Sequence, residues 1–213
     1  VQFDSSSVIR LGPSTDLRMG DLQYHRYLLQ MTRGTTTFRV LRDSDAKIEI
    51  STPSVSVVPL RQGTYRVTVQ PDGSSEITVR AGEAELLSPS GSERLPAGQT
   101  ILTRGPVSDP EFMTVAAIPN DEWDRWNMDR DRYFDRYNDV AHYTSPDMSG
   151  TEDLAAHGRW VQDPSYGNVW VPNNVGPDWA PYRDGRWDYV DYYGWSWISY
   201  DPWGWAPYHY GNW

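Results

Sequence analysis

GRWVQDPSYGNVWVPNNVGPDWAPYRD (residues 158–184) is followed directly by GRWDYVDYYGWSWISYDPWGWAPYHY (residues 185–210), and the two stretches are related copies. With one gap before Trp205, Gly158-Arg159-Trp160 aligns with Gly185-Arg186-Trp187, and Trp170 aligns with Trp197. The string Trp179-Ala180-Pro181-Tyr182 likewise aligns with Trp205-Ala206-Pro207-Tyr208, and Gly211-Asn212-Trp213 opens a third copy. A period of about 26 to 27 residues is typical of a stacked supersecondary unit. The sequence therefore predicts an array of aromatic repeats over residues 158–213, with the third copy cut short.

Each copy has the pattern of short β-strands. Aromatic and polar residues alternate in segments such as Tyr193 to Ser199, and glycine or proline closes each segment. This period of two with turn residues between the segments favours strands over helices. Pro181 and Pro207 are expected to exclude a continuous helix through their segments.

The repeats hold nine of the eleven tryptophans and eight of the fourteen tyrosines. Large flat side chains can form the core of a small module that has few aliphatic residues. Alternatively, some of them form an exposed surface that stacks on sugars, peptides or a partner protein. The candidate binding residues are the repeated aromatic positions: Trp160, Trp170, Trp179, Tyr182, Trp187, Trp197, Trp205 and Tyr208.

Residues 1–118 read as an all-β module. Alternation is clear at Phe38 and Val40, at Ile48 and Ile50, and from Tyr65 to Val69, and Pro71-Asp72-Gly73-Ser74 is typical of a hairpin turn. Strands about ten residues apart without intervening helices predict an antiparallel sandwich, jelly roll or compact β-roll. The expected strands are 8–11, 24–31, 35–41, 47–51, 55–58, 65–69, 76–80, 83–87 and 100–103.

Four motifs in this module resemble the FecR-type domain. They are Ser51-Thr52-Pro53, the stretch from Arg61 to Val67 (RQGTYRV), the stretch from Val79 to Leu86 (VRAGEAEL), and Leu95-Pro96-Ala97-Gly98-Gln99. Gly63, Gly82 and Gly98 separate the strands, where a positive φ or a close backbone crossing is expected. The resemblance implies an extracytoplasmic, non-catalytic β module in a bacterial envelope. In iron-transport regulators this family relays a signal from an outer-membrane receptor to a sigma factor, but their cytoplasmic helical segment and membrane span have no counterpart here.

Residues 119–157 form an acidic connecting segment. Pro119-Asn120-Asp121-Glu122 is a helix start signal with Asn120 as the cap, and a helix is expected over about 121–140. Residues 141–150 have the composition of a linker, and Thr151 to His157 can form one or two helical turns before Gly158. In the long helix an aromatic stripe is expected to pack, opposite a solvated acidic face. The stripe is Trp123, Trp126, Arg130, Tyr133, Phe134 and Tyr137, and the acidic face is Asp124, Asp131, Asp135 and Asp139.

Charge and composition exclude several classes of function. The net charge is −10, and the repeats carry three arginines against six aspartates, which disfavours nucleic acid as a partner. The sequence has no apolar run of the length of a membrane span. It has no cysteine, so disulfides, thiolate metal sites and cysteine nucleophiles are absent.

Catalytic signatures are also missing. The four histidines, His25, His142, His157 and His209, form no ligand pair, and no nucleophile or phosphate-loop motif is present. Asp129-Arg130-Asp131 has the opening spacing of a calcium loop, but Phe134 stands where such a loop needs glycine. We therefore expect no enzyme, no cofactor and no metal.

Two main hypotheses for function follow. The first is a structural or interaction protein of the envelope whose aromatic repeats bind a partner protein or a larger assembly. The second is a carbohydrate- or peptidoglycan-binding module with sugar rings stacked on Trp and Tyr. A FecR-like signalling role is a further alternative that rests on the resemblance alone.

Overall fold

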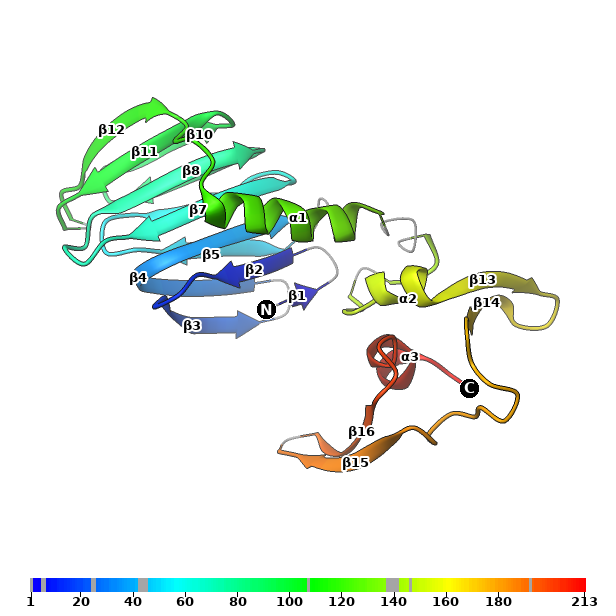
Figure 1. Cartoon of the computed structure of the whole chain (residues 1–213). Helices are drawn as coiled ribbons and strands as arrows, with labels where there is room; N and C mark the ends of the chain where they lie inside the picture. The colour runs from blue at the N-terminus through cyan, green and yellow to red at the C-terminus, as the bar shows by residue number, and fades with distance from the viewer. Residues whose placement is uncertain are drawn as a thin grey trace. The chain divides into compact units, whose positions relative to one another are not determined.

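The computed structural model describes residues 2–4, 7–23, 26–41, 46–106, 108–136, 142–145, 147–191 and 193–213. The chain forms two compact units, Val1–Asn127 and Met128–Trp213, and the boundary falls within the long helix α1 (Glu122–Arg136). Strands make up most of the regular structure of the chain, which confirms the mainly β prediction (Figure 1).

The first unit is a single curled sheet whose strands run in the order β10-β9-β6-β5-β4-β7-β8-β11-β12, with β1 paired to β2, and β2 and β3 paired to β4. The bounds are β1 (Gln2–Asp4), β2 (Ser7–Leu11), β3 (Asp16–Gln23), β4 (Arg26–Val40), β5 (Lys47–Ser51), β6 (Ser56–Pro59), β7 (Gly63–Val69), β8 (Ser75–Ala81), β9 (Glu83–Ser88), β10 (Gly91–Pro96), β11 (Gln99–Arg104) and β12 (Glu111–Ala116).

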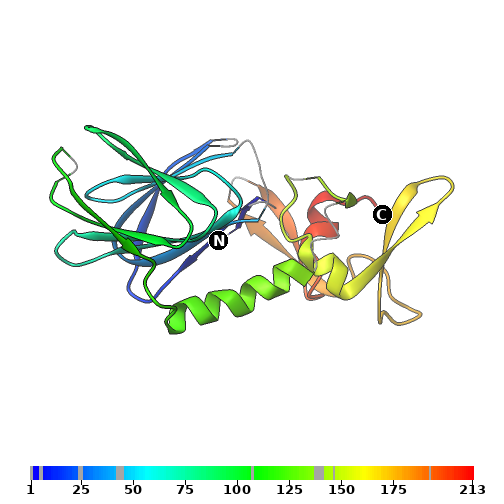
Figure 2. The same cartoon turned by 90° about the horizontal axis from the view of Figure 1, so that it is seen from above.

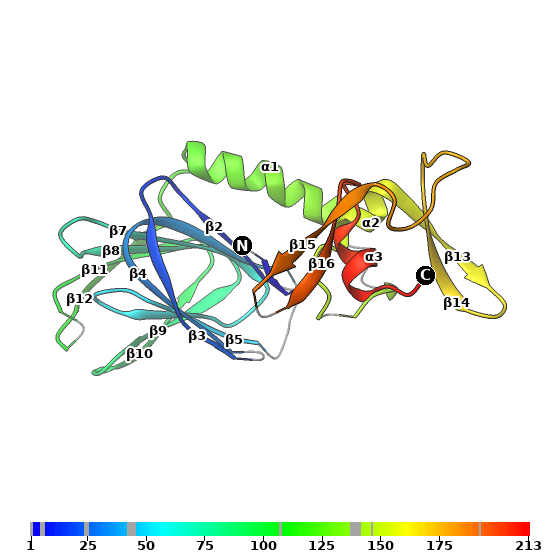
Figure 3. The same ribbon diagram turned by 90° about the horizontal axis from the view of Figure 1, so that it is seen from below.

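Strand β4 joins the two layers of this sheet. Its first half pairs with β3 and β5, and its second half pairs with β2 and β7. Figure 3 shows β7, β8 and β11 in one layer and β5, β9 and β10 in the other. The pairing is antiparallel except between β4 and β5. These two strands run parallel, and both begin at the same end, where Lys47 lies beside Arg26. One pair thus departs from the all-antiparallel arrangement expected from the sequence.

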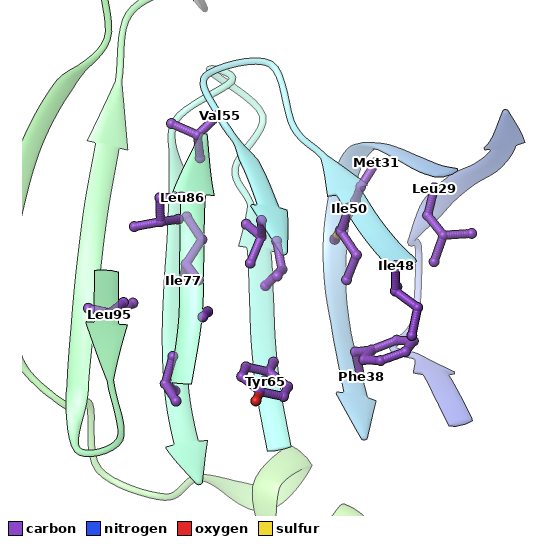
Figure 4. Packing of buried hydrophobic residues seen from close by; sticks show 14 of the residues in the cluster. Leu29, Met31, Phe38, Ile48, Ile50, Val55, Tyr65, Ile77, Leu86 and Leu95 are labelled. Carbon is purple, nitrogen blue, oxygen red and sulfur yellow. The ribbon is translucent and has the colours of Figure 1, made fainter. Parts of the chain in front are cut away.

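The core lies between the two layers and consists of the alternating apolar positions. Phe38, Tyr65 and Ile77 are fully buried in one layer, and Ile50, Leu86 and Leu95 contribute from the other layer (Figure 4). Side chains on a strand alternate between its faces, so the period-2 pattern of the sequence identified these positions correctly.

The strand prediction missed β1, β3, β10 and β12. Each of them lies at an edge of the sheet, where one face or both are exposed and the apolar alternation is weak. The expected strands 24–31 and 35–41 are one strand, β4, because Gly34 bends the chain at φ +91° without ending it. A Cβ at Gly34 would lie 2.5 Å from the Cα of Thr15, so only glycine fits there.

The glycine positions of the FecR-like motifs behave as expected. Gly82 has φ +88° at the corner between β8 and β9, and a Cβ there would lie 2.3 Å from the hydroxyl of Tyr65. That hydroxyl donates to the carbonyl of Arg61 (2.5 Å) and accepts from the N–H of Glu83 (3.3 Å). Gly63 makes a similar close approach to the carbonyl of Ala81, and Gly98 has φ +84°.

A row of polar residues crosses the face of the sheet opposite the core. Register pairs place Arg10, Thr37, Arg66, Thr78 and Thr100 side by side on β2, β4, β7, β8 and β11. Residues 118–127 cover this row with matching polar groups. The indole N–H of Trp123 donates to Thr37 Oγ1 (2.8 Å), Arg10 donates to Asn127 Oδ1 (3.3 Å), and the N–H of Ile118 donates to Thr100 Oγ1 (3.2 Å).

Asp124 is the centre of this contact. It is 5% exposed and accepts from Arg66 Nη1 (2.7 Å) and from Arg80 through Nη2 (2.7 Å) and Nε (3.2 Å). Asp121 adds a second carboxylate 2.8 Å from Arg66 Nη1. A buried carboxylate needs such paired cations and hydrogen bonds to remain charged.

Asp121 and Asp124 also cap α1. Asp121 Oδ1 accepts the N–H of Asp124 (3.0 Å), and Asp124 Oδ2 accepts the N–H of Asp121 (3.3 Å), a reciprocal capping box. Burial raises the pKa of Asp121, but the hydrogen bond from Asp124 and the charge of Arg66 outweigh it, so the net pKa lies below its ordinary value. The cap is therefore Asp121, whereas the sequence predicted Asn120.

The predicted faces of the helix are correct for Trp123, which packs on the sheet, and for the exposed Asp135, but wrong for Trp126, Asp124 and Asp131. Asp124, Asn127 and Asp131 are 5%, 2% and 6% exposed, whereas Trp126 is 39% exposed. An amphipathic helix buries its apolar face only against an apolar surface, and here the sheet presents the polar row to α1. Tyr137 and Asp139, and the side chains of Tyr133 and Phe134, lie outside what the structure describes.

The second unit contains two β-hairpins and two short helices. They are α2 (Glu152–His157), β13 (Gly158–Asp163) with β14 (Gly167–Pro172), β15 (Gly185–Val190) with β16 (Gly194–Ser199), and α3 (Trp205–Tyr210). Helix α3 lies between the two hairpins in each view (Figures 1, 2 and 3). The turns expected at residues 151–157 and the strands expected in the repeats are confirmed.

Helix α3 contradicts the expectation that Pro207 excludes a helix. Gly204 is the N-cap, so Pro207 lies in the first turn, where its missing N–H would have had no partner within the helix. The matching segment around Pro181 forms no helix, as expected, and Tyr182 there has φ +61°.

The two hairpins are structurally equivalent. Trp160 pairs with Trp170 across one hairpin, and Trp187 pairs with Trp197 across the other. Both turns end in a left-handed glycine, Gly167 and Gly194. Equivalent backbone hydrogen bonds close the two hairpins, from Asn173 N–H to the His157 carbonyl (2.7 Å) and from Tyr200 N–H to the Asp184 carbonyl (3.0 Å).

Candidate aromatic binding surface

The interior of the second unit is small and aromatic. Leu154 of α2 and Ala206 of α3 are 4% and 1% exposed and pack against Trp160 and Trp170. The indole N–H of Trp170 donates to the carbonyl of Leu154 (2.9 Å), which ties the first hairpin to α2. Trp197 and Trp203 are also buried, at 8% and 3% exposed.

The first glycine of each copy seats a tryptophan. A Cβ at Gly158 would lie 2.3 Å from the ring of Trp170, and a Cβ at Gly185 would lie 2.5 Å from the ring of Trp197. The indole therefore lies flat over the backbone of the opposite strand, which no other residue would permit at that position. This contact explains why the Gly-Arg-Trp motif begins with glycine in both copies.

Most of the predicted site residues belong to one network of ring contacts. Tyr208 is its centre, with its ring centroid 5.0 Å from Tyr182, 6.1 Å from Trp197 and 6.3 Å from Trp203. Trp203 in turn contacts Trp170 (5.0 Å) and Trp179 (5.7 Å). The structure thus joins six of the eight predicted residues: Trp170, Trp179, Tyr182, Trp187, Trp197 and Tyr208. Trp160 stacks on Tyr143 instead (4.8 Å), and Trp205 stacks on His209 (3.9 Å).

The same residues divide by exposure. Trp197 is buried, and Trp160, Trp170, Trp179 and Tyr208 are half-buried. Trp187, Trp205 and Tyr182 are 55%, 51% and 43% exposed. Some of the eight predicted residues thus belong to the core and others to the surface, so neither interpretation holds for all eight.

The most exposed rings extend along the second hairpin. Tyr189 and Trp195 form the next cross-strand pair beyond Trp187 and Trp197, and their rings meet edge to face at 5.8 Å. Residues two apart on a strand share a face, so Trp187, Tyr189, Trp195 and Trp197 form one continuous surface, which we call the aromatic face. Tyr189 and Trp195 are 61% and 69% exposed, whereas Trp197 anchors the face in the interior.

The first hairpin has no such extension. Gln162 and Asn168 occupy the positions that correspond to Tyr189 and Trp195. Tyr189, Trp195 and Trp203 are not among the predicted site residues, because their positions are not aromatic in the first copy. The sequence does hold a signal for Tyr189 and Trp195, since these positions are aromatic in the second copy and polar in the first.

Aspartates alternate with the aromatic residues in the sequence of the second hairpin and its flanks. Asp188 lies on β15 and Asp191 follows it, and Asp188 is 3.4 Å from Arg186. Burial, with the nearby charge of Asp184, raises the pKa of Asp201 above its ordinary value. No cluster of three or more His, Asp or Glu side chains able to hold a metal ion occurs within the described residues.

Comparisons with known proteins match parts of the chain. Residues 151–213, which cover the second unit from α2 onward, match a family of unknown function (DUF6600). A comparison with curated proteins finds no match. Two solved structures of a "putative anti-sigma factor" from Parabacteroides distasonis are 23% and 22% identical to the chain, each with a TM-score of 0.44. The alignment covers 52% of this chain and 51% of that protein, so it spans about half the length of each.

No helix among the described residues is long and apolar enough to cross a membrane.

Proposed function

We propose that this chain is a non-catalytic, extracytoplasmic interaction protein that binds a partner protein through the aromatic face of β15 and β16. The observation that carries the proposal is the exposure of Trp187, Tyr189 and Trp195, at 55%, 61% and 69%, on a single face. Contiguous exposed aromatics of this size are characteristic of interaction sites.

The anchoring of this face supports binding. Trp187 contacts the buried Trp197 edge to face (5.5 Å) and lies parallel to Tyr182 (5.9 Å, 4° between planes). Rings held in this way lose little conformational entropy when a partner covers them, so their buried area contributes more fully to affinity.

The extracytoplasmic location rests on the resemblance of about residues 1–105 to the FecR-type domain, which is carried by the four motifs within residues 51–99. In this proposal the first unit is a second docking module and the aromatic repeats provide the specific contact. A FecR-like signalling component is a further alternative on the same resemblance.

A glycan is the second candidate ligand. Asp191 follows directly after β15, the strand that carries Trp187 and Tyr189, whereas Asp188 lies on the opposite face of that strand. Sugar-binding sites combine ring stacking with carboxylates that accept from hydroxyl groups. Soluble peptidoglycan fragments or other oligosaccharides would then bind the same rings.

The test compares capture by the wild-type chain and by the double variant Tyr189→Gln/Trp195→Asn. These substitutions copy Gln162 and Asn168 of the first hairpin, so the hairpin should keep its fold. Tagged protein is incubated with detergent-solubilised envelopes of its source cells. We expect one partner in stoichiometric amount with the wild type and its loss with the double variant.

The control is Tyr166→Ser, because Tyr166 is 84% exposed in the turn of the first hairpin, away from the aromatic face. It should capture the partner as well as the wild type does. Equal capture by the double variant would contradict the proposal. Binding of oligosaccharides with no protein captured would replace it with the glycan alternative.

A further inference from the structure

We propose that the partner contributes an extended, cationic segment, bearing arginine or lysine, which pairs with the outer edge of β15 and lies against the aromatic face. This inference rests on the proposed function and names the chemistry of its partner.

Among the described residues, the outer edge of β15 carries no other strand, although the N–H of Tyr189 donates to Asp188 Oδ1 (3.0 Å), a bond that an added strand would replace. Within the part of the chain that the structure describes, β15 pairs with β16 alone, and five of its six residues are exposed. An edge strand presents N–H and C=O groups along its free side, and extended peptides bind proteins by adding a strand there. The inner edge of the same strand is fixed by β16, which holds the hairpin in register.

The side chains of β15 match a cationic strand on the aromatic face, whereas on the other face Asp188 already pairs with Arg186 (3.4 Å). An added strand lies about 4.8 Å away, so its alternate side chains lie beside Trp187 and Tyr189. Guanidinium and ammonium groups bind over such ring faces, and their aliphatic stems pack on the rings. The intervening side chains of the added strand lie on the other face of the hairpin, beside Asp188.

The charge of the second unit favours a cationic segment over a second copy of this chain at the edge of β15. Residues 128–213 carry thirteen aspartates and glutamates against six arginines, so the second unit attracts cationic segments. A second copy of this chain at the same edge would place its own Asp184, Asp188 and Asp191 alongside these three carboxylates, which like-charge repulsion opposes.

The test measures binding of fluorescent alternating peptides to the full chain by anisotropy. The probes are an arginine–threonine peptide, its glutamine–threonine and glutamate–threonine counterparts, and an arginine–proline peptide that keeps the charge but lacks the backbone N–H at every second residue, which disfavours pairing as a strand. We expect the arginine–threonine peptide to bind and the other three to bind at least about tenfold more weakly.

Two variants separate the contributions to this binding. Tyr189→Gln/Trp195→Asn should weaken binding of the arginine–threonine peptide by about tenfold, because the ring contacts are lost. Asp188→Asn should weaken the same binding by about threefold, because a negative charge is lost. Tyr166→Ser should leave the affinity unchanged. Circular dichroism of each variant confirms that the hairpin is folded.

The inference fails if all four peptides bind equally, if the double variant keeps full affinity, or if the arginine–proline peptide binds as well as the arginine–threonine peptide. If no cationic peptide binds but the double variant still loses its captured partner, the inference is wrong and the proposed function stands. If the captured partner is also retained by the double variant, both are wrong.

Discussion

At the residue scale, a glycine and a tryptophan define each copy of the repeat. Gly158 and Gly185 leave the space in which Trp170 and Trp197 lie flat on the opposite strand. The indole can thus be buried in a module too small for a conventional aliphatic core. The paired residues Trp160 and Trp187 occupy the same register position in their hairpins, yet their exposure differs, because the surroundings of the two hairpins differ.

Gly185→Ala should destabilise the second unit by about 1–3 kcal/mol, because the added methyl group would overlap the ring of Trp197 and the carbonyl of Ile198. Tryptophan fluorescence during urea unfolding measures the change. Gly176→Ala is the matched control, since nothing lies within 4 Å of the added Cβ there. If the two substitutions lowered the free energy of unfolding equally, close packing of Trp197 against Gly185 would be contradicted.

Asp201→Asn should stabilise the second unit at neutral pH. Burial and the charge of Asp184 raise the pKa of Asp201. A carboxyl group whose pKa is raised by folding stabilises the folded state while it is protonated. This contribution is fully present below the unfolded-state pKa of about 3.9 and is lost as the pH rises through the folded-state pKa. The variant should therefore unfold at a higher temperature than the wild type at pH 7.

The same experiment at pH 3.5 provides the comparison, because there the two proteins should differ less. Asp178→Asn, an exposed aspartate of the same unit, serves as the control for charge alone. A wild type that is more stable than Asp201→Asn at pH 7 would overturn the assignment.

At the scale of elements, the position of α1 is set by polar groups. Core positions of the sheet follow from alternation in the sequence, and alternation also places Arg66, between Tyr65 and Val67, on the opposite face. What the sequence could not provide is the surface that covers Arg66, since Asp124 lies far along the chain. The helix itself was predictable from its start signal and periodicity, but its buried face was not, because hydrophobic periodicity carries no information about a polar docking row.

Asp124→Asn should destabilise the first unit by about 3 kcal/mol, because Arg66 and Arg80 would lose the carboxylate that compensates their charges in a buried site. Urea unfolding followed by far-ultraviolet circular dichroism measures it. Asp129→Asn is the control, since Asp129 pairs with Arg132 only at the surface (2.7 Å) and should change stability by less than about 0.5 kcal/mol. A loss below that level for Asp124→Asn would show that the ion cluster does not hold the helix.

At the scale of the whole molecule, the chain combines two cores of different chemistry. The first unit has an aliphatic core between two sheet layers, and the second has a network of indole and phenol rings around Leu154 and Ala206. The sequence predicted both compositions and the β class, because alternation and repeats are local patterns. It did not predict the curl through β4, the parallel β4–β5 pair or the ring network, because these depend on contacts between segments distant in the sequence.

These separate cores predict that the units unfold independently. Nine of the eleven tryptophans lie in residues 158–213, so fluorescence reports the second unit, whereas hydrogen exchange of residues 63–81 reports the first. Gly185→Ala should lower the urea midpoint of the fluorescence transition and leave the exchange of β7 and β8 unchanged, while Asp124→Asn should do the reverse. If each variant shifted both transitions by the same amount, the two units would form one cooperative structure, and the aromatic face would then be coupled to the sheet of the first unit.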